Sequence, residues 1–266
     1  MASTAAAAGA ASSIRTAKRT LRKSMATRLS SIDPQDLRAQ SHKVTSRILA
    51  SSTYRSARNI SIYVSTDTGE VETDELCRCT LADETKRLYV PLFATPAPTA
   101  LGEQGKVGFA PDMRMLQLRS LAEYEGMKRN RWGIREPEDW VVDDPETHGA
   151  VESDVSHRRP RPDALDAASG GEGLDLILAP GVAFDVFAGR LGHGKGYYDR
   201  YLSQAEAWAA KRGKQGPVCV ALGLREQVLP EGERVPADER DRVLDGIVTP
   251  DGVLRGHEDR GKWQGS

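Results

Sequence analysis

The fold that we expect is decided by residues 174–202, LDLILAPGVAFDVFAGRLGHGKGYYDRYL. The stretch opens with an apolar run, 174–184, which predicts a buried strand. Three glycines then alternate with His193 and Lys195, and apolar residues on one side predict a helix over about 196–211. A buried strand, a glycine-rich loop and a helix in this order are typical of a parallel sheet covered by helices.

The same alternation of strands and helices extends along the rest of the chain. Apolar and β-branched runs predict strands at 59–65, 87–93, 217–224 and 244–250, with an edge strand at 113–118. Apolar spacing and capping residues predict helices over about 14–29, from Pro34 after a capping Asp33, and over about 73–83. We therefore expect an α/β fold of three layers, α/β/α, around a mostly parallel central sheet.

Composition divides the chain into a leader, one domain and a polar tail. Residues 1–17 are rich in Ala and Ser and contain no acid, which predicts a disordered leader or, alternatively, a short organellar presequence. Residues 18–250 form the single expected domain. Within it, prolines, acids and a basic run at 156–162 predict a long surface loop at about 140–173, with no function assigned to it. Residues 251–266 are expected to be a polar tail.

Charge and cysteine content exclude several classes of function. The formal net charge of −1 gives no overall field that would attract nucleic acid or an anionic membrane, so any anion site must be built locally. No apolar run reaches the about 20 residues needed to cross a bilayer. Three cysteines cannot form a disulfide framework and suit a reducing compartment. We expect a cytoplasmic monomer, with a mitochondrial location as the alternative.

The glycine-rich loop has the features of a phosphate site. Glycines let backbone N–H groups approach an anion, and the start of the next helix points further N–H groups toward it. Arg190 and Lys195 add positive charge. The alternative is that the glycines only turn the chain. The loop is neither a complete P-loop, because Gly196 stands where Ser or Thr would hold magnesium, nor a dinucleotide fingerprint.

Three side chains after the loop remain open on position alone. Asp199 lies in the first turn of the expected helix, where it can cap the helix or hold a metal beside phosphates. Tyr197 and Tyr198 can stack on a flat ring or pack in the core.

The loop and four other segments together resemble one protein family. The segments are KRTLRK (18–23), ISIYVSTDTGEVET (60–73), RWGIREP (131–137), DLILAPGVAFDVFAGRLGHGKGYYDRYL (175–202) and ERDRVLDGIVT (239–249). In this order they resemble the 5-formyltetrahydrofolate cyclo-ligases, also called 5,10-methenyltetrahydrofolate synthetases. The resemblance implies an enzyme that uses ATP and Mg²⁺ to close 5-formyltetrahydrofolate to 5,10-methenyltetrahydrofolate, releasing ADP and phosphate. Phosphorylation turns the formyl oxygen into a good leaving group, and N10 then attacks the formyl carbon.

The resemblance also implies roles for individual residues. ATP contacts are expected from Lys18, Arg19, Thr20, Leu21 and Arg22, and from Arg190, Leu191, Gly192, His193, Gly194, Lys195, Gly196, Tyr197 and Tyr198. Lys195 and Arg190 are the expected catalytic cations. Folate contacts are expected from Val64, Glu70, Trp132, His193, Gly194, Lys195, Gly196 and Tyr197, and magnesium ligands from Asp199 and Asp245.

Two departures from the family pattern leave other functions open. His193 stands where many members carry arginine, and the turn before Glu70 carries an extra residue. One alternative is a sugar-phosphate or acyl-CoA-handling enzyme of similar architecture, for which Asp185 is the available carboxylate. Another is a folate or nucleotide binder without turnover.

Overall fold

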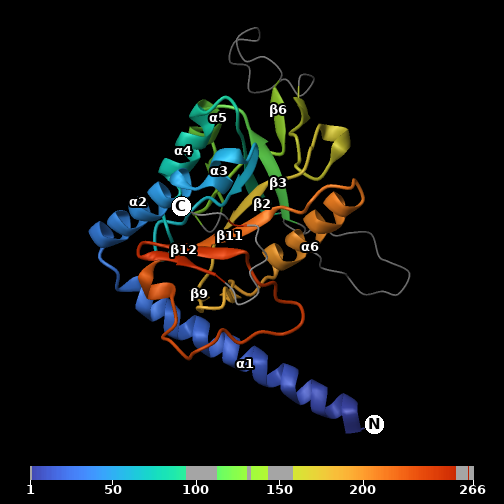
Figure 1. The fold of residues 1–266 in the computed structure, drawn as a ribbon. Coiled ribbons are helices and arrows are strands. Elements are labelled where there is room, and N and C mark those ends of the chain that lie inside the picture. The colour runs from blue at the N-terminus through green and yellow to red at the C-terminus, as the bar shows by residue number, and fades with distance from the viewer. Residues whose placement is uncertain (1, 94–112, 131–132, 143–157, 256–262, 264–266) are drawn as a thin grey trace.

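The computed structural model describes residues 2–93, 113–130, 133–142, 158–255 and 263, with side chains from Ser12 onward. It shows the expected α/β fold (Figure 1). The central sheet has the order β13-β12-β11-β8-β1-β2-β3. Its strands are β1 (Asn59–Ile62), β2 (Arg87–Phe93), β3 (Met113–Leu118), β8 (Leu176–Ala179), β11 (Val218–Leu222), β12 (Gly246–Thr249) and β13 (Gly252–Leu254).

The five inner strands are parallel, and the two edge strands, β3 and β13, pair antiparallel to their neighbours. The inner strands β1, β8 and β12 are buried at every position. Strands buried on both faces need continuous apolar runs, and this is the pattern that the sequence shows there. The predicted mostly parallel sheet is confirmed.

Helices cover both faces of the sheet. They are α1 (Ala2–Ser30), α2 (Pro34–Ala50), α3 (Ser52–Ser56), α4 (Asp74–Ala82), α5 (Leu121–Glu125) and α6 (Tyr197–Ala210). The chain passes from β1 to β2 through α4 and from β8 to β11 through α6, in opposite directions along the sheet. Because such crossovers are right-handed, α4 and α6 lie on opposite faces. The order of strands therefore reverses between β1 and β8, which lie side by side.

The long strand predicted at 174–184 is divided by Pro180. Strand β8 ends at Ala179, and the chain resumes as β9 (Ala183–Phe184), which pairs with β10 (Arg190–Leu191) outside the main sheet. Proline has no N–H to give to a neighbouring strand, so the ladder cannot continue through it. The turn at Pro180 carries the chain from the carboxyl end of β8 into the glycine-rich loop.

The N-terminal residues differ from the expected disordered leader. Helix α1 begins at Ala2 and includes most of residues 1–17. Alanine has the highest helix propensity, and this segment contains no proline, so the helix extends outward beyond the body of the protein (Figure 1).

The predicted surface loop at 140–173 is partly packed against the sheet. Strands β6 (Trp140–Val142) and β7 (Arg158–Pro160) pair antiparallel, and a short helical turn, η2 (Ala167–Ser169), follows. The guanidinium of Arg161 is buried, where it pairs with Glu123 and donates to three backbone carbonyls. Ala164 is fully buried. The expectation of a loop separate from the core is therefore wrong for these residues, while residues 143–157 lie outside the described part.

The C-terminal tail also differs from its prediction. Residues 252–254 form the edge strand β13, and Trp263 is buried in the main core near Gly246. Only a few residues of this segment carry apolar side chains, which explains why composition alone indicated a polar tail.

Candidate functional site

The reversal between β1 and β8 places two loops at the carboxyl ends of these neighbouring strands. The turn that contains Glu70 follows β1, and the glycine-rich loop follows β8. In open α/β sheets, ligands bind outside the carboxyl ends of the strands where the strand order reverses. The fold therefore brings together the two segments that the sequence assigned to folate and ATP.

The glycine-rich loop is anchored at its base by Asp185. This buried carboxylate accepts hydrogen bonds from the backbone N–H groups of Phe187, Gly189 and Val235. Asp185 was the carboxylate expected to serve a sugar-phosphate or acyl-CoA chemistry. Its bonds to three backbone groups instead give it a structural role in shaping the loop.

Two glycines of the loop adopt backbone conformations that other residues rarely reach. Gly194 has φ of 95° and Gly196 has φ of 66°. Gly196 is also the N-cap of α6, and its conformation turns the chain directly into that helix. The glycines therefore shape the loop, and the N-terminus of a 14-residue helix opens beside it.

The two cations predicted to be catalytic have different surroundings. Arg190 is buried, and its guanidinium donates to the carbonyl oxygen of Pro180 and pairs with Asp199, both over 3.2 Å. Lys195 is exposed at the loop surface. The exposed ammonium is thus presented to solvent, whereas the guanidinium of Arg190 connects the end of β8 to the start of α6.

His193 lies at the same surface in an electropositive setting. Partial loss of water around its ring and the nearby charges of Arg190 and Arg22 lower its pKa below the usual value for histidine. His193 therefore adds no permanent positive charge to the loop at neutral pH.

Helix α1 reaches the loop through the face that carries Lys18 and Arg22. The Nε atom of Arg22 donates to the carbonyl oxygen of Gly192 over 2.7 Å. Lys18 pairs with Asp241, and with Asp238 over 3.3 Å. Residues four apart share a helix face, so Lys18 and Arg22 both project from the same side of α1.

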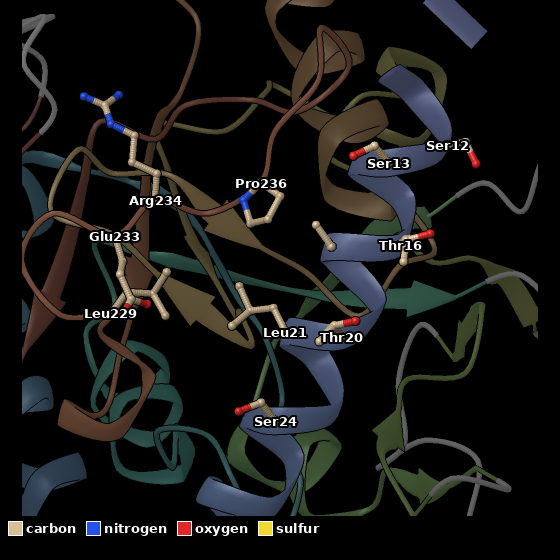
Figure 2. Close-up of a pocket in the computed structure, with 11 residues that line it drawn as sticks. Ser12, Ser13, Thr16, Thr20, Leu21, Ser24, Leu229, Glu233, Arg234 and Pro236 are labelled. Atoms are coloured by element: carbon tan, nitrogen blue, oxygen red, sulfur yellow. The ribbon is translucent and has the colours of Figure 1, made fainter. Parts of the chain in front are cut away.

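The other predicted ATP contacts of α1 lie elsewhere around the helix. Thr20 and Leu21 line a groove of about 900 Å³ between α1 and residues 229–236 (Figure 2), and Arg19 is exposed. Leu21 also packs against a small apolar cluster with Met25 and Leu229. Five consecutive residues span more than one helical turn and cannot share one face. The structure therefore separates Lys18 and Arg22 from the residues between them.

The turn after β1 holds Glu70 in a buried position. Its Oε1 atom accepts hydrogen bonds from the backbone N–H of Thr66 over 2.6 Å and from the Thr66 hydroxyl over 2.7 Å. Burial raises the pKa of Glu70 despite these bonds. Burial raises the pKa of Tyr198, and the negative charge of Glu70 makes a smaller contribution in the same direction.

The remaining predicted contacts divide between the core and the loop surface. Val64 and Leu191 are buried, as is the ring of Tyr198. The ring of Tyr197 packs on Phe93 at the end of β2, with centroids 4.9 Å apart. Phe93 was not predicted, although its position at a strand's carboxyl end was readable from the sequence. Trp132 lies outside the described residues.

The two predicted magnesium ligands make different contacts. Asp199 accepts hydrogen bonds from the Arg190 guanidinium and, over 3.3 Å, from the backbone N–H of Arg242. Asp245 lies before β12, where its carboxylate accepts the backbone N–H of Cys219 over 2.8 Å. Within the described ranges, no group of three or more His, Cys, Asp or Glu side chains could hold a metal ion.

Two carboxylates that the prediction missed lie next to Lys18. Asp238 and Asp241 belong to the segment that precedes β12, and the adjacent Arg242 bonds to Asp199. This segment therefore passes between α1 and the start of α6. Its acidic character was visible in ERDRVLDG, but no local pattern indicated that Lys18 would be its partner.

Comparisons with known proteins agree with this arrangement of loops on an α/β sheet. The sequence model of the 5-formyltetrahydrofolate cyclo-ligase family matches residues 14–250. A protein of Caenorhabditis elegans named "Probable 5-formyltetrahydrofolate cyclo-ligase" is 31% identical over 89% of this chain and 94% of its own length. The 5-formyltetrahydrofolate cyclo-ligase of Mus musculus is 29% identical over 91% and 98%.

A solved structure supports the same assignment. The NMR structure of a 5,10-methenyltetrahydrofolate synthetase from Aquifex aeolicus superposes with a TM-score of 0.58 at 25% identity, covering 91% of this chain and 94% of that one. The fold and sequence thus define an α/β enzyme of the ligase class. The chain belongs to the 5-formyltetrahydrofolate cyclo-ligase family. None of the helices described is both long enough and apolar enough to span a membrane.

Proposed function

We propose that this enzyme closes 5-formyltetrahydrofolate to 5,10-methenyltetrahydrofolate with ATP and Mg²⁺, releasing ADP and phosphate. The observation that carries the proposal is the meeting of three segments at one edge of the sheet. Arg22 of α1 bonds to Gly192, and the turn of Glu70 and the glycine-rich loop follow β1 and β8, which are neighbouring parallel strands. A reaction between two bound substrates requires such a shared edge.

In the proposed reaction the formyl oxygen takes the γ-phosphoryl group of ATP, and ADP leaves. N10 of the folate then attacks the formyl carbon, and phosphate departs with the former formyl oxygen. Lys195, the N–H groups of the loop and the start of α6 are suited to bind the phosphates and stabilise the charge that develops on them. Glu70 is suited to accept a hydrogen bond from the pterin ring.

The buried contacts of Arg190 support a positioning role for this residue. Its guanidinium holds Asp199 at the first turn of α6 and is bonded to Pro180 at the end of β8. The guanidinium thereby connects the end of β8 to the start of α6.

The carboxylates around the loop are ligands of the type that magnesium ions bind. Hard oxygen ligands together with phosphate oxygens are what Mg²⁺ prefers. Asp199 would hold the ion, together with a carboxylate of residues 238–245. Asp245 is the predicted second ligand, and Asp241 is an additional candidate because it already lies beside the phosphate-binding Lys18. The ion would supply charge neutralisation for phosphoryl transfer.

An optical assay with and without ATP tests the proposal. Absorbance of 5,10-methenyltetrahydrofolate should appear when the enzyme, 5-formyltetrahydrofolate, Mg²⁺ and ATP are combined, and ADP should form in equal amount. Binding of both compounds without ADP release would support the alternative of a binder without turnover. Product formation that is independent of ATP would also contradict the proposal.

We further propose that the enzyme acts in the cytoplasm as a monomer with only small-molecule partners. Fluorescence microscopy of the full chain and of a variant that lacks residues 2–11 would distinguish this location from a mitochondrial one.

A further inference from the structure

Gln227 joins the two loops of the candidate site through one buried side chain. It ends the short helical turn η3 (Arg225–Gln227), which follows β11, and its side chain is fully buried. Its Oε1 atom accepts the backbone N–H of Leu224 over 2.8 Å. Its Nε2 atom donates to the carbonyl oxygens of Gly181 over 2.6 Å and Gly69 over 3.4 Å. Both N–H groups of the amide are therefore used.

The first carbonyl belongs to the turn of Glu70, and the second lies just before β9, whose pairing with β10 connects it to the start of the glycine-rich loop. Gly69 immediately precedes Glu70 in the turn after β1, and its φ of 80° is one that glycine adopts readily. Gly181 follows Pro180, at the point where the chain leaves β8 toward the glycine-rich loop. A Cβ atom at Gly181 would lie 2.4 Å from the ring of Phe184, so the backbone is closely packed there. The amide of Gln227 thus spans the boundary between β1 and β8.

We propose that Gln227 is a positioning residue that fixes the turn of Glu70 relative to the glycine-rich loop. The inference rests on the proposed function, in which these two segments hold folate and ATP. Gln227 touches neither substrate in this account. It sets the separation of the two loops, and transfer between bound substrates is sensitive to misplacement of about 1 Å.

Gln40 provides a matched control for this role. It is a second buried glutamine, on α2, and it also contacts η3. Its Oε1 atom accepts the backbone N–H of Arg225 over 3.0 Å, and its Nε2 atom donates to Asp36 and Glu226. It has no hydrogen bond to Gly69 or Gly181 in the described part of the chain. Loss of Gln40 therefore perturbs the same turn without disconnecting the two loops.

The test compares Gln227→Met with Gln40→Met in the full-length enzyme. Both variants lose buried hydrogen bonds, so both are expected to have a lower Tm. Only Gln227→Met should lower kcat by about tenfold or more and raise the KM for 5-formyltetrahydrofolate. In a Glu70→Gln background, the further rise in this KM should disappear, because Gln227 acts on folate through the turn of Glu70.

Amide hydrogen exchange provides a readout that does not depend on turnover. Exchange at residues 66–70 and 189–196 should accelerate in Gln227→Met and stay unchanged in Gln40→Met. Gln227→Asn, which keeps the amide but shortens the side chain, replaces the methionine variant if that variant does not fold. Equal loss of kcat in the two methionine variants, or equal acceleration of exchange, would overturn the inference. Absence of ATP-dependent turnover in the wild-type enzyme would overturn the proposed function instead, and the exchange comparison would then decide the inference alone.

Discussion

Arg22 in the first helix is hydrogen-bonded to the carbonyl oxygen of Gly192, 170 residues later in the chain, over 2.7 Å. A Cβ atom placed on Gly194 would lie 3.2 Å from the same guanidinium. The glycine-rich loop therefore has one wall supplied by α1, and this wall is positively charged. The position of the helix is fixed by the apolar cluster that contains Met25, Leu29 and Leu191.

Replacement of Arg22 by methionine should weaken ATP binding. Methionine retains an unbranched apolar side chain but removes the guanidinium, so the hydrogen bond to Gly192 and the positive charge are lost. We expect the KM for ATP to rise by about tenfold, which corresponds to about 1.4 kcal/mol of binding free energy. Steady-state kinetics with varied ATP measures the change. The exposed neighbour Lys23, replaced by methionine, is the control, and an equal effect in both variants would show that only overall charge matters.

Lys195→Ala should lower kcat by about 10²-fold or more, because loss of a preorganised charge contact in a transition state commonly costs this much. The optical assay at saturating ATP and folate measures kcat directly. Lys211→Ala, an exposed lysine after α6, is the matched control. A near-normal rate in Lys195→Ala would show that the transferred phosphate is held elsewhere.

Magnesium titrations should distinguish the roles of the three aspartates. Asp199→Asn is expected to raise the Mg²⁺ concentration needed for half-maximal activity, since one negatively charged oxygen ligand is lost. Asp241→Asn and Asp245→Asn compare the two candidates for the second ligand. The variant that shifts the titration identifies the ligand, and the other should mainly change Tm. An unchanged titration in Asp199→Asn would return that residue to a purely structural role beside Arg190.

His193 should make ATP binding dependent on pH. Its pKa is lowered in the free enzyme, so the ring is neutral near pH 7, whereas bound phosphate favours the protonated ring. ATP binding is therefore expected to take up a proton and to tighten as the pH falls below 7. His193→Arg should bind ATP several-fold more tightly at pH 7 and lose this pH dependence. Calorimetry in buffers of different ionisation enthalpy measures the proton uptake, and absence of uptake would contradict the assignment.

Glu70→Gln should separate binding from stability. The raised pKa means that the folded state holds the proton of Glu70 more tightly than the unfolded state. The stabilising contribution of this proton is therefore present below the usual pKa of glutamic acid and is lost as the pH rises through the folded-state value. Glutamine cannot ionise, and its oxygen can still accept the bonds from Thr66.

The free energy of unfolding of Glu70→Gln, measured in urea, should accordingly rise relative to wild type between pH 4.5 and pH 8. The KM for 5-formyltetrahydrofolate should increase by at least about tenfold, because a hydrogen bond to a charged acceptor is lost. Ser120→Ala, which alters a helix cap far along the sequence, controls for the assay. An unchanged KM would remove Glu70 from the folate site.

Periodicity and apolar runs were sufficient to predict the sheet and most helices, because the inner strands are buried on both faces. The break at Pro180 was visible in the sequence, but a continuous apolar pattern on both sides of it concealed the change from sheet to hairpin. The helix at the N-terminus could not be predicted from composition, because runs of alanine and serine occur in both helices and disordered segments.

Residues of the candidate site could be predicted only where they belong to a recognisable motif. The glycine-rich loop and Glu70 could be assigned by resemblance, and helical spacing paired Lys18 with Arg22. The partners of Lys18, Asp238 and Asp241, could not be found in this way, because they lie more than 200 residues away and no local pattern encodes the contact. The same applies to Gln227, whose bonds to Gly69 and Gly181 depend on how distant segments pack.

The pairing of β6 with β7 has a consequence for engineering this protein. The two strands close the base of the segment between Val142 and Arg158, and Arg161 fastens that base to the neighbouring backbone. The entropy of closing a chain rises only slowly with its length. A reporter domain or affinity handle inserted between these strands should therefore leave the candidate site intact.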